Sequence, residues 1–209
     1  MVTLVDCPGL NHGLLMERRR RVWITGGSRG IGRGLVDAFV GADYAVFTCA
    51  RRRPEVSLPD GVGFTEADLR DADQVERAVS SCVDHLGGID LLINNAGGSP
   101  MVRADEASAS FSHKIVALNL LAPLYCATAA QSVMKDQGEG GNIINIASVS
   151  GLRPSPQTAV YGAAKAGLIH LSQSLAIEWA PRIRVNSVAL GLVETPDSLE
   201  HYGGTAGVE

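Results

Sequence analysis

The chain has 209 residues, of which 45% are hydrophobic and 19% are charged, and its formal net charge is −4. This length and composition are typical of one globular domain with a hydrophobic core. The negative charge argues against general binding to nucleic acid or to an anionic membrane.

Short apolar runs alternate with longer segments of helical periodicity along the chain. We expect strands at residues 21–25, 44–49, 63–66, 90–93, 142–146 and 183–187, and helices at 31–40, 72–86, 107–134 and 159–179. Helices between strands indicate a parallel sheet covered on both faces. The expected fold class is α/β, a three-layer, doubly wound, Rossmann-like sheet.

Residues 1–20 lack the order of a secretory signal and are expected to form a weakly ordered extension, before a single domain at 21–209. The basic run at 17–21 is expected to be solvated. No uninterrupted apolar run reaches ~18 residues, so no membrane span is expected. The four cysteines (Cys7, Cys49, Cys82 and Cys126) show no paired spacing and the five histidines form no metal motif. These patterns predict reduced thiols, a cytoplasmic setting and no protein-ligated metal.

A glycine-rich turn follows the first expected strand, in the sequence VWITGGSRGIG (22–32). Its glycines allow a sharp turn and close approach of the backbone to a ligand. The helix after the turn presents free N–H groups and a positive dipole end to a pyrophosphate. Strand, turn and helix in this order predict a dinucleotide site, with glycine used only for tight packing as the alternative. The expected cofactor contacts here are Gly26, Ser28, Arg29, Gly30, Ile31 and Gly32.

The residues after the second expected strand indicate which ribose the site accepts. About 20 residues beyond the glycine turn, an acidic residue favours NAD and an arginine favours NADP. Three arginines, beginning with Arg51, follow Ala50, and Arg29 could reach the same phosphate. Arginine pairs well with phosphate oxygens. NADP(H) is therefore favoured and NAD(H) remains possible, the alternative being that these arginines touch no ligand.

Tyr161 and Lys165 stand four residues apart in YGAAK (161–165), with only small residues between them. On a helix they lie on one face, one turn apart. A positive charge beside a phenol favours the phenolate. The pair can therefore act as a proton donor and acceptor near neutral pH, although a chance pair on an amphipathic helix would look the same.

Six motifs, in order over about residues 21–195, resemble those of the short-chain dehydrogenase/reductase family. They are TGGSRGIG (25–32), ADL (67–69), NNAG (94–97), Asn119 in ALNLLAP, INIASVSG (144–151) and YGAAK (161–165). The resemblance implies strand order 3-2-1-4-5-6. It also implies further cofactor contacts from Asp68, Leu69, Asn95, Ala96, Gly97, Tyr161, Lys165 and Thr195.

The resemblance implies a catalytic set of Asn119, Ser148, Tyr161 and Lys165. In carbonyl reduction, NADPH would give a hydride to carbon and Tyr161 a proton to oxygen, while Ser148 holds that oxygen. Lys165 would assist the phenol and contact the nicotinamide ribose, and Asn119 would hold a relay water. The expected function is an NAD(P)(H)-dependent oxidoreductase that interconverts a secondary alcohol and a ketone. The alternative is a non-catalytic dinucleotide-binding or sensor module, or an inactive truncated fragment.

The C-terminal part departs from the family pattern. Leu190 stands where the family usually has a proline, although Gly191 and Thr195 are retained. Family members normally continue past the point where this chain stops, so we expect a C-terminally truncated domain that lacks the last strand. Apolar residues around helices 107–134 and 159–179 predict a homodimer or homotetramer.

Overall fold

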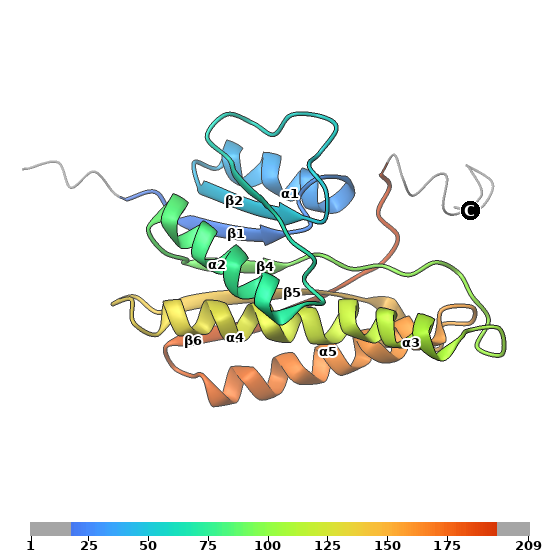
Figure 1. Ribbon diagram of the computed structural model, residues 1–209. Helices are drawn as coiled ribbons and strands as arrows, with labels where there is room; N and C mark the ends of the chain where they lie inside the picture. Colours follow the sequence, from blue (N-terminus) through green and yellow to red (C-terminus); the bar gives the residue numbers. More distant parts are fainter. Residues whose placement is uncertain (1–17, 196–209) are drawn as a thin grey trace, which may run out of the picture.

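Six parallel strands form one sheet in the order β3-β2-β1-β4-β5-β6 (Figure 1), which confirms the predicted topology. The structure is a computed structural model that describes residues 18–195. The strands are β1 (Arg21–Thr25), β2 (Ala45–Ala50), β3 (Gly63–Glu66), β4 (Leu91–Asn94), β5 (Gly141–Ser148) and β6 (Ile183–Leu190). Most of the expected N-terminal extension, Cys7, and the chain end, where the C-terminal truncation was expected, lie outside the described residues.

Helices cover both faces of the sheet, as the alternation of elements predicts. They are α1 (Gly30–Gly41), α2 (Ala72–Leu86), α3 (Ala109–Val116), α4 (Ala122–Met134) and α5 (Ala159–Glu178). Neighbouring residues of β1 point to opposite faces. Val22 and Ile24 pack in one cluster with Val36 of α1, whereas Trp23 packs with residues of α2, α4 and α5. Side chains at 49, 82 and 126 are free, buried cysteines, as expected.

The single helix expected at 107–134 is divided in the structure. A π-helical segment, η1 (Ala117–Leu121), separates α3 from α4. Within it, Asn119 is fully buried, and its Nδ2 donates to the carbonyl of Ile115 over 2.9 Å. A side chain that takes the carbonyl four residues earlier competes with the regular backbone ladder. Segments of this kind are frequent at functional sites.

The continuous helical stretch Ala109–Met134 is long and apolar enough to cross a membrane, by length and composition alone. Polar residues interrupt its apolar sequence, so it contains no uninterrupted apolar run of that length. In this fold, the stretch contributes Cys126, Ala130 and Met134 to the core, and each of these residues is fully buried. The core position accounts for its apolar composition.

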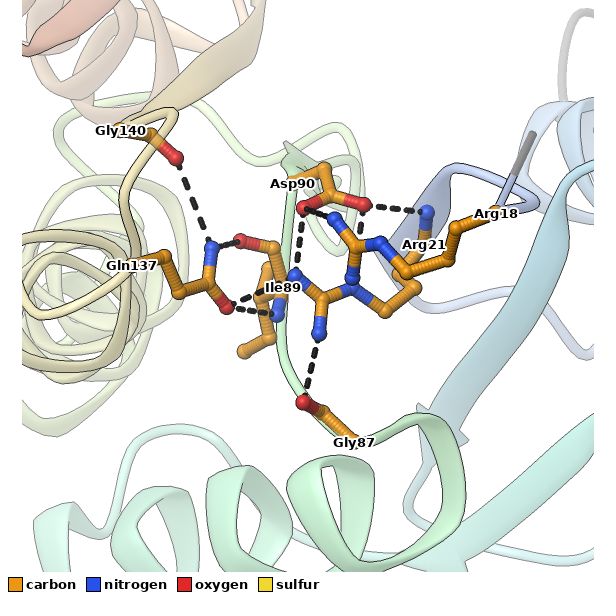
Figure 2. A network of polar contacts seen from close by, with 7 residues as sticks. All are labelled: Arg18, Arg21, Gly87, Ile89, Asp90, Gln137 and Gly140. Atoms are coloured by element: carbon orange, nitrogen blue, oxygen red, sulfur yellow. Dashed lines mark hydrogen bonds and ion pairs between the residues drawn. The ribbon is translucent and has the colours of Figure 1, made fainter. Parts of the chain in front are cut away.

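Arg21 is buried at the amino end of β1, although the basic run was expected to be solvated. Its guanidinium donates to both carboxylate oxygens of Asp90, over 2.6 and 3.0 Å, and to the carbonyl of Gly87 over 2.5 Å. Figure 2 shows Gln137 completing the network between Arg21 and the backbone of Ile89. This polar network joins the starts of β1 and β4 to the ends of α2 and α4.

The ionisation of Asp90 follows from these contacts. Burial raises the pKa of Asp90, but the hydrogen bonds and charge of Arg21, with a further contribution from Arg18, outweigh it and hold the pKa below its usual value. The carboxylate therefore stays charged and keeps its buried partner satisfied. The network lies at the end of the sheet opposite the glycine turn.

Candidate active site

The predicted motifs meet at the carboxyl ends of β1, β4 and β5, which are neighbours in the sheet. Thr25, the last residue of β1, joins the glycine turn to the NNAG segment. Its Oγ1 accepts hydrogen bonds from the backbone N–H groups of Asn95 and Ala96, each over 3.0 Å. The Asn95 side chain donates in return to the carbonyl of Thr25 over 2.9 Å. The glycine turn and the NNAG segment are thereby held as one unit.

The glycine turn has the compact geometry that a dinucleotide requires. Gly26 has φ +71°, in the left-handed region that favours glycine. A Cβ on Gly32 would lie 2.1 Å from the carbonyl oxygen of Gly26 and 2.5 Å from Asn95 Nδ2. Helix α1 begins at Gly30, and its N-cap residue, Arg29, makes no side-chain cap hydrogen bond. The turn therefore brings an uncapped helix N-terminus to the surface, where its N–H groups fit a pyrophosphate.

The adenosine side of the expected site carries both signs of charge. Arg29 and Arg51 are exposed, and no acidic residue lies within the arginine run that follows β2. Asp68, expected to hold the adenine, forms an ion pair with Arg70, which donates to it from Nε over 2.9 Å and from its backbone over 3.1 Å. Hydrogen bonding from Arg70 lowers the pKa of Asp68, against the effect of burial, and the Arg51 charge lowers it slightly further. The following residue, Leu69, is buried.

The NNAG segment, η1 and α5 converge at Gly97. Asn119 Oδ1 accepts from the backbone N–H of Gly98 over 2.9 Å, and its Nδ2 donates to the carbonyl of Gly98 over 2.9 Å. A Cβ on Gly97 would lie 2.8 Å from Asn119 Oδ1 and 3.2 Å from Lys165 Nζ. Gly97 therefore allows the loop to lie against both predicted catalytic residues at once.

Tyr161 and Lys165 lie on α5, where Lys165 Nζ is 5.7 Å from the centre of the Tyr161 ring. Lys165 is only 3% exposed, and its ammonium donates to the carbonyl of Ile146 in β5 over 2.7 Å. Burial lowers the pKa of Lys165 from 10.5 to about 8. A lysine whose pKa is moved so far by burial, beside a tyrosine, is typical of functional sites.

Ser148 ends β5 and caps the short helix η2 (Val149–Gly151), which packs on α5. Its Oγ accepts from the backbone N–H of Ser150 over 3.1 Å. This contact leaves the hydroxyl proton of Ser148 able to serve a second group. A Cβ on Gly151 would lie 2.7 Å from the backbone nitrogen of Ala166, so η2 touches the helix that carries Tyr161 and Lys165.

A small hollow next to Tyr161 lies between α3 and the start of α5. Its lining includes Ser99, Val102, Phe111 and Gln157 together with Tyr161. The Val102 backbone N–H donates to the carbonyl of Gln157 over 2.7 Å, which joins the loop after NNAG to the segment before α5. Thr195, expected to contact the nicotinamide, is the last described residue.

Buried polar contacts that the sequence did not predict support the site from below. Asn94 donates to Asn145 Oδ1 over 2.8 Å, and Asn145 donates to Ser172 Oγ over 2.9 Å, which links β4, β5 and α5 beneath the site. The sequence signal that could have predicted these contacts is the presence of Asn94 and Asn145 within otherwise apolar strands. Within the described residues, no group of three or more acidic, histidine or cysteine side chains could hold a metal ion.

Comparison with known proteins places these motifs in a family. A family model described as short chain dehydrogenase matches residues 20–201. A sorbitol dehydrogenase from Cereibacter sphaeroides is 33% identical over 87% of this chain and 72% of its own length. Aldohexose dehydrogenase from Thermoplasma acidophilum superposes with a TM-score of 0.83 at 26% identity, over 92% of this chain and 74% of that one.

A solved structure of ElxO with NADP bound has a TM-score of 0.81 at 29% identity, over 88% of this chain and 78% of that one. Motifs, strand order and relatives therefore agree. The chain belongs to the short-chain dehydrogenase/reductase family and is an oxidoreductase of that family.

Proposed function

We propose that this protein interconverts a secondary alcohol and a ketone by hydride transfer, with Tyr161 as the general acid and base. The observation that carries the proposal is the buried ammonium of Lys165, held beside the Tyr161 ring. Burying a charged group lowers the stability of the folded protein, and groups buried in this way are concentrated at functional sites. A nicotinamide cofactor, when bound, supplies or accepts the hydride.

In the reducing direction, Tyr161 donates a proton to the carbonyl oxygen of the substrate. The Ser148 hydroxyl donates a hydrogen bond to the same oxygen, because its own acceptor side is engaged with Ser150. The Lys165 ammonium stabilises the phenolate that remains. Positioned acid–base catalysis of this kind typically contributes ~10²–10⁴-fold in rate. In the oxidising direction, Tyr161 takes the proton from the alcohol.

Asn119 acts on this site chiefly through the loop that it holds. Both ends of its side-chain amide bond to backbone groups of Gly98 and Ile115. A relay water, implied by the family resemblance, would use Lys165 Nζ and the remaining lone pair of Asn119 Oδ1. Protons would then leave Tyr161 by way of Lys165.

NADP(H) is the proposed cofactor, with NAD(H) as the second choice. Exposed arginines at 29 and 51, and the absence of an acidic residue in the run at 51–53, support a 2′-phosphate. The ion pair with Arg70 also neutralises Asp68, which would otherwise repel that phosphate. The relatives named above for sorbitol and aldohexose oxidation support a hydroxylated small molecule as the substrate.

We also propose a cytoplasmic location and a homo-oligomeric state for this protein. Buried free thiols support a cytoplasmic location. Exposed Ile177 on α5, at 82% of its full exposure, and Leu152, at 66%, support a homodimer or homotetramer that covers them. Light scattering at micromolar concentration tests the assembly, and a monomer would contradict it.

Tyr161→Phe tests the function directly. The variant keeps the ring beside Lys165 and removes the phenolic hydroxyl, which is the group that would donate and accept the proton. We expect NADPH to bind with nearly unchanged affinity in a fluorescence titration, while reduction of a panel of ketones falls at least ~10²-fold. Substantial turnover by the variant would remove Tyr161 from the role. Binding without turnover in the wild-type chain would instead support a non-catalytic module.

A further inference from the structure

Thr48 is a fully buried hydroxyl residue in β2 that touches the glycine turn. It lies opposite Ile24 of β1 in the sheet register. Its Oγ1 donates to the carbonyl of Ile24 over 2.6 Å and accepts from the backbone N–H of Gly27 over 3.0 Å. The single hydroxyl therefore ties the end of β1 and the second glycine of the turn to β2.

Thr48 packs so closely against Gly27 that position 27 has no space for a side chain. A Cβ on Gly27 would lie 2.2 Å from Thr48 Oγ1 and 2.7 Å from Cγ2 of Val36 in α1. The preceding turn residue, Gly26, donates its N–H to the carbonyl of Cys49 over 2.8 Å. Two successive residues of β2 thus hold two successive residues of the turn.

We propose that Thr48 is a positioning residue for the pyrophosphate of the cofactor, an inference that rests on the proposed function. The N–H groups at the start of α1 can bind phosphate oxygens only if the turn presents them in a fixed direction. Thr48 fixes this direction from behind, where no ligand reaches it. Because NADH and NADPH share the pyrophosphate, Thr48 serves both cofactors equally, unlike Arg51.

Thr48→Val tests the inference, since valine has nearly the same shape and neither hydrogen bond. The variant leaves the buried N–H of Gly27 without its acceptor. We expect the Kd values of NADH and NADPH, measured by fluorescence titration, to rise by the same factor of about ten. Thr48→Ser keeps the hydroxyl, and we expect it to restore both Kd values to within about threefold of wild type.

Thr65→Val, in half-buried β3, is the matched control and should bind both cofactors like wild type. If Thr48→Val does not fold, Thr48→Ala removes the same two hydrogen bonds and carries the comparison. Three results would each overturn the inference. The variant without the hydroxyl could bind both cofactors with unchanged Kd values, or Thr48→Ser could bind them as weakly as that variant. The third is an equal rise in both Kd values in Thr65→Val. A wild-type chain that binds neither cofactor would overturn the proposed function and the inference together.

Discussion

The Lys165→Met variant should differ from wild type in how its stability depends on pH. In the unliganded protein, the free energy of unfolding of the variant, relative to that of wild type, should be higher at pH 7 than at pH 10. Lys165 is 3% exposed, and burial lowers its pKa from 10.5 to about 8. At about 1.4 kcal/mol for each pH unit, holding this ammonium in the folded protein at neutral pH costs about 3 kcal/mol. Methionine has a similar length and no charge, so the cost disappears in the variant.

The sign of the effect follows from the direction of the pKa change. Below pH 8, the lysine is charged in both the folded and the unfolded chain, and the cost is fully present. Between pH 8 and 10.5, the folded chain binds fewer protons than the unfolded chain, so wild-type stability rises with pH. Above that range, the lysine is neutral in both states and the cost is gone.

Chemical denaturation of both proteins at pH 7 and pH 10 measures the difference. The variant lacks the hydrogen bond to the Ile146 carbonyl at both pH values. Any change in the strength of this bond when Lys165 ionises is already contained in the pKa of Lys165, so the pKa alone sets the difference between the two pH values. The free energy of unfolding of Lys165→Met, relative to wild type, should be about 2–3 kcal/mol higher at pH 7 than at pH 10.

Lys114→Met is the matched control, because Lys114 is exposed on α3 and its substitution should show no such pH dependence. The reasoning is refuted if Lys165→Met shows the same relative stability at both pH values. That outcome would mean that the ammonium is well solvated in the folded protein.

Three further substitutions test other parts of the site and fold. Arg51→Asp should shift the ratio of kcat/KM values from NADPH towards NADH by at least about tenfold, and an unchanged ratio would show that Arg51 does not face the ribose. Gly32→Ala should abolish measurable NADPH binding, because its Cβ would lie 2.1 Å from the Gly26 carbonyl; tight binding would contradict the turn geometry. Asp90→Asn should lower the free energy of unfolding by about 2 kcal/mol at pH 7. Because the pKa of Asp90 is held low, this difference should shrink below about pH 4, and a difference that persists in acid would count against the ion pair.

Local sequence patterns were sufficient to place the strands and most of the helices of this chain, but not to order the strands in the sheet. Alternating apolar runs and glycine turns identified six strands, and the family motifs implied their order, which the structure confirms. The exact ends differed most for β5 and β6, which each extend to eight residues. Strand ends depend on pairing with a neighbour that lies far away in sequence.

Other features required the three-dimensional arrangement. Arg21 belongs to a basic run by sequence, and only the fold brings Asp90 and Gln137 to it. Nothing local in ALNLLAP indicates a π-helical segment, which arises where the Asn119 side chain takes the Ile115 carbonyl. Asp68 stays a predicted adenine contact, and the structure adds that its carboxylate pairs with Arg70, two residues later. The contact of Thr48 with Gly27 likewise joins a residue of β2 to the glycine turn, 21 residues away in the sequence.

The most direct test of the central claim follows one hydrogen from cofactor to product. Incubation with NADPH deuterated at the transferable C4 position and a ketone that wild type accepts should give an alcohol with one deuterium on its carbinol carbon. Tyr161→Phe should bind the same NADPH and form almost no labelled alcohol. Wild-type protein that binds NADPH and yields no deuterated alcohol from any ketone tested would contradict the account.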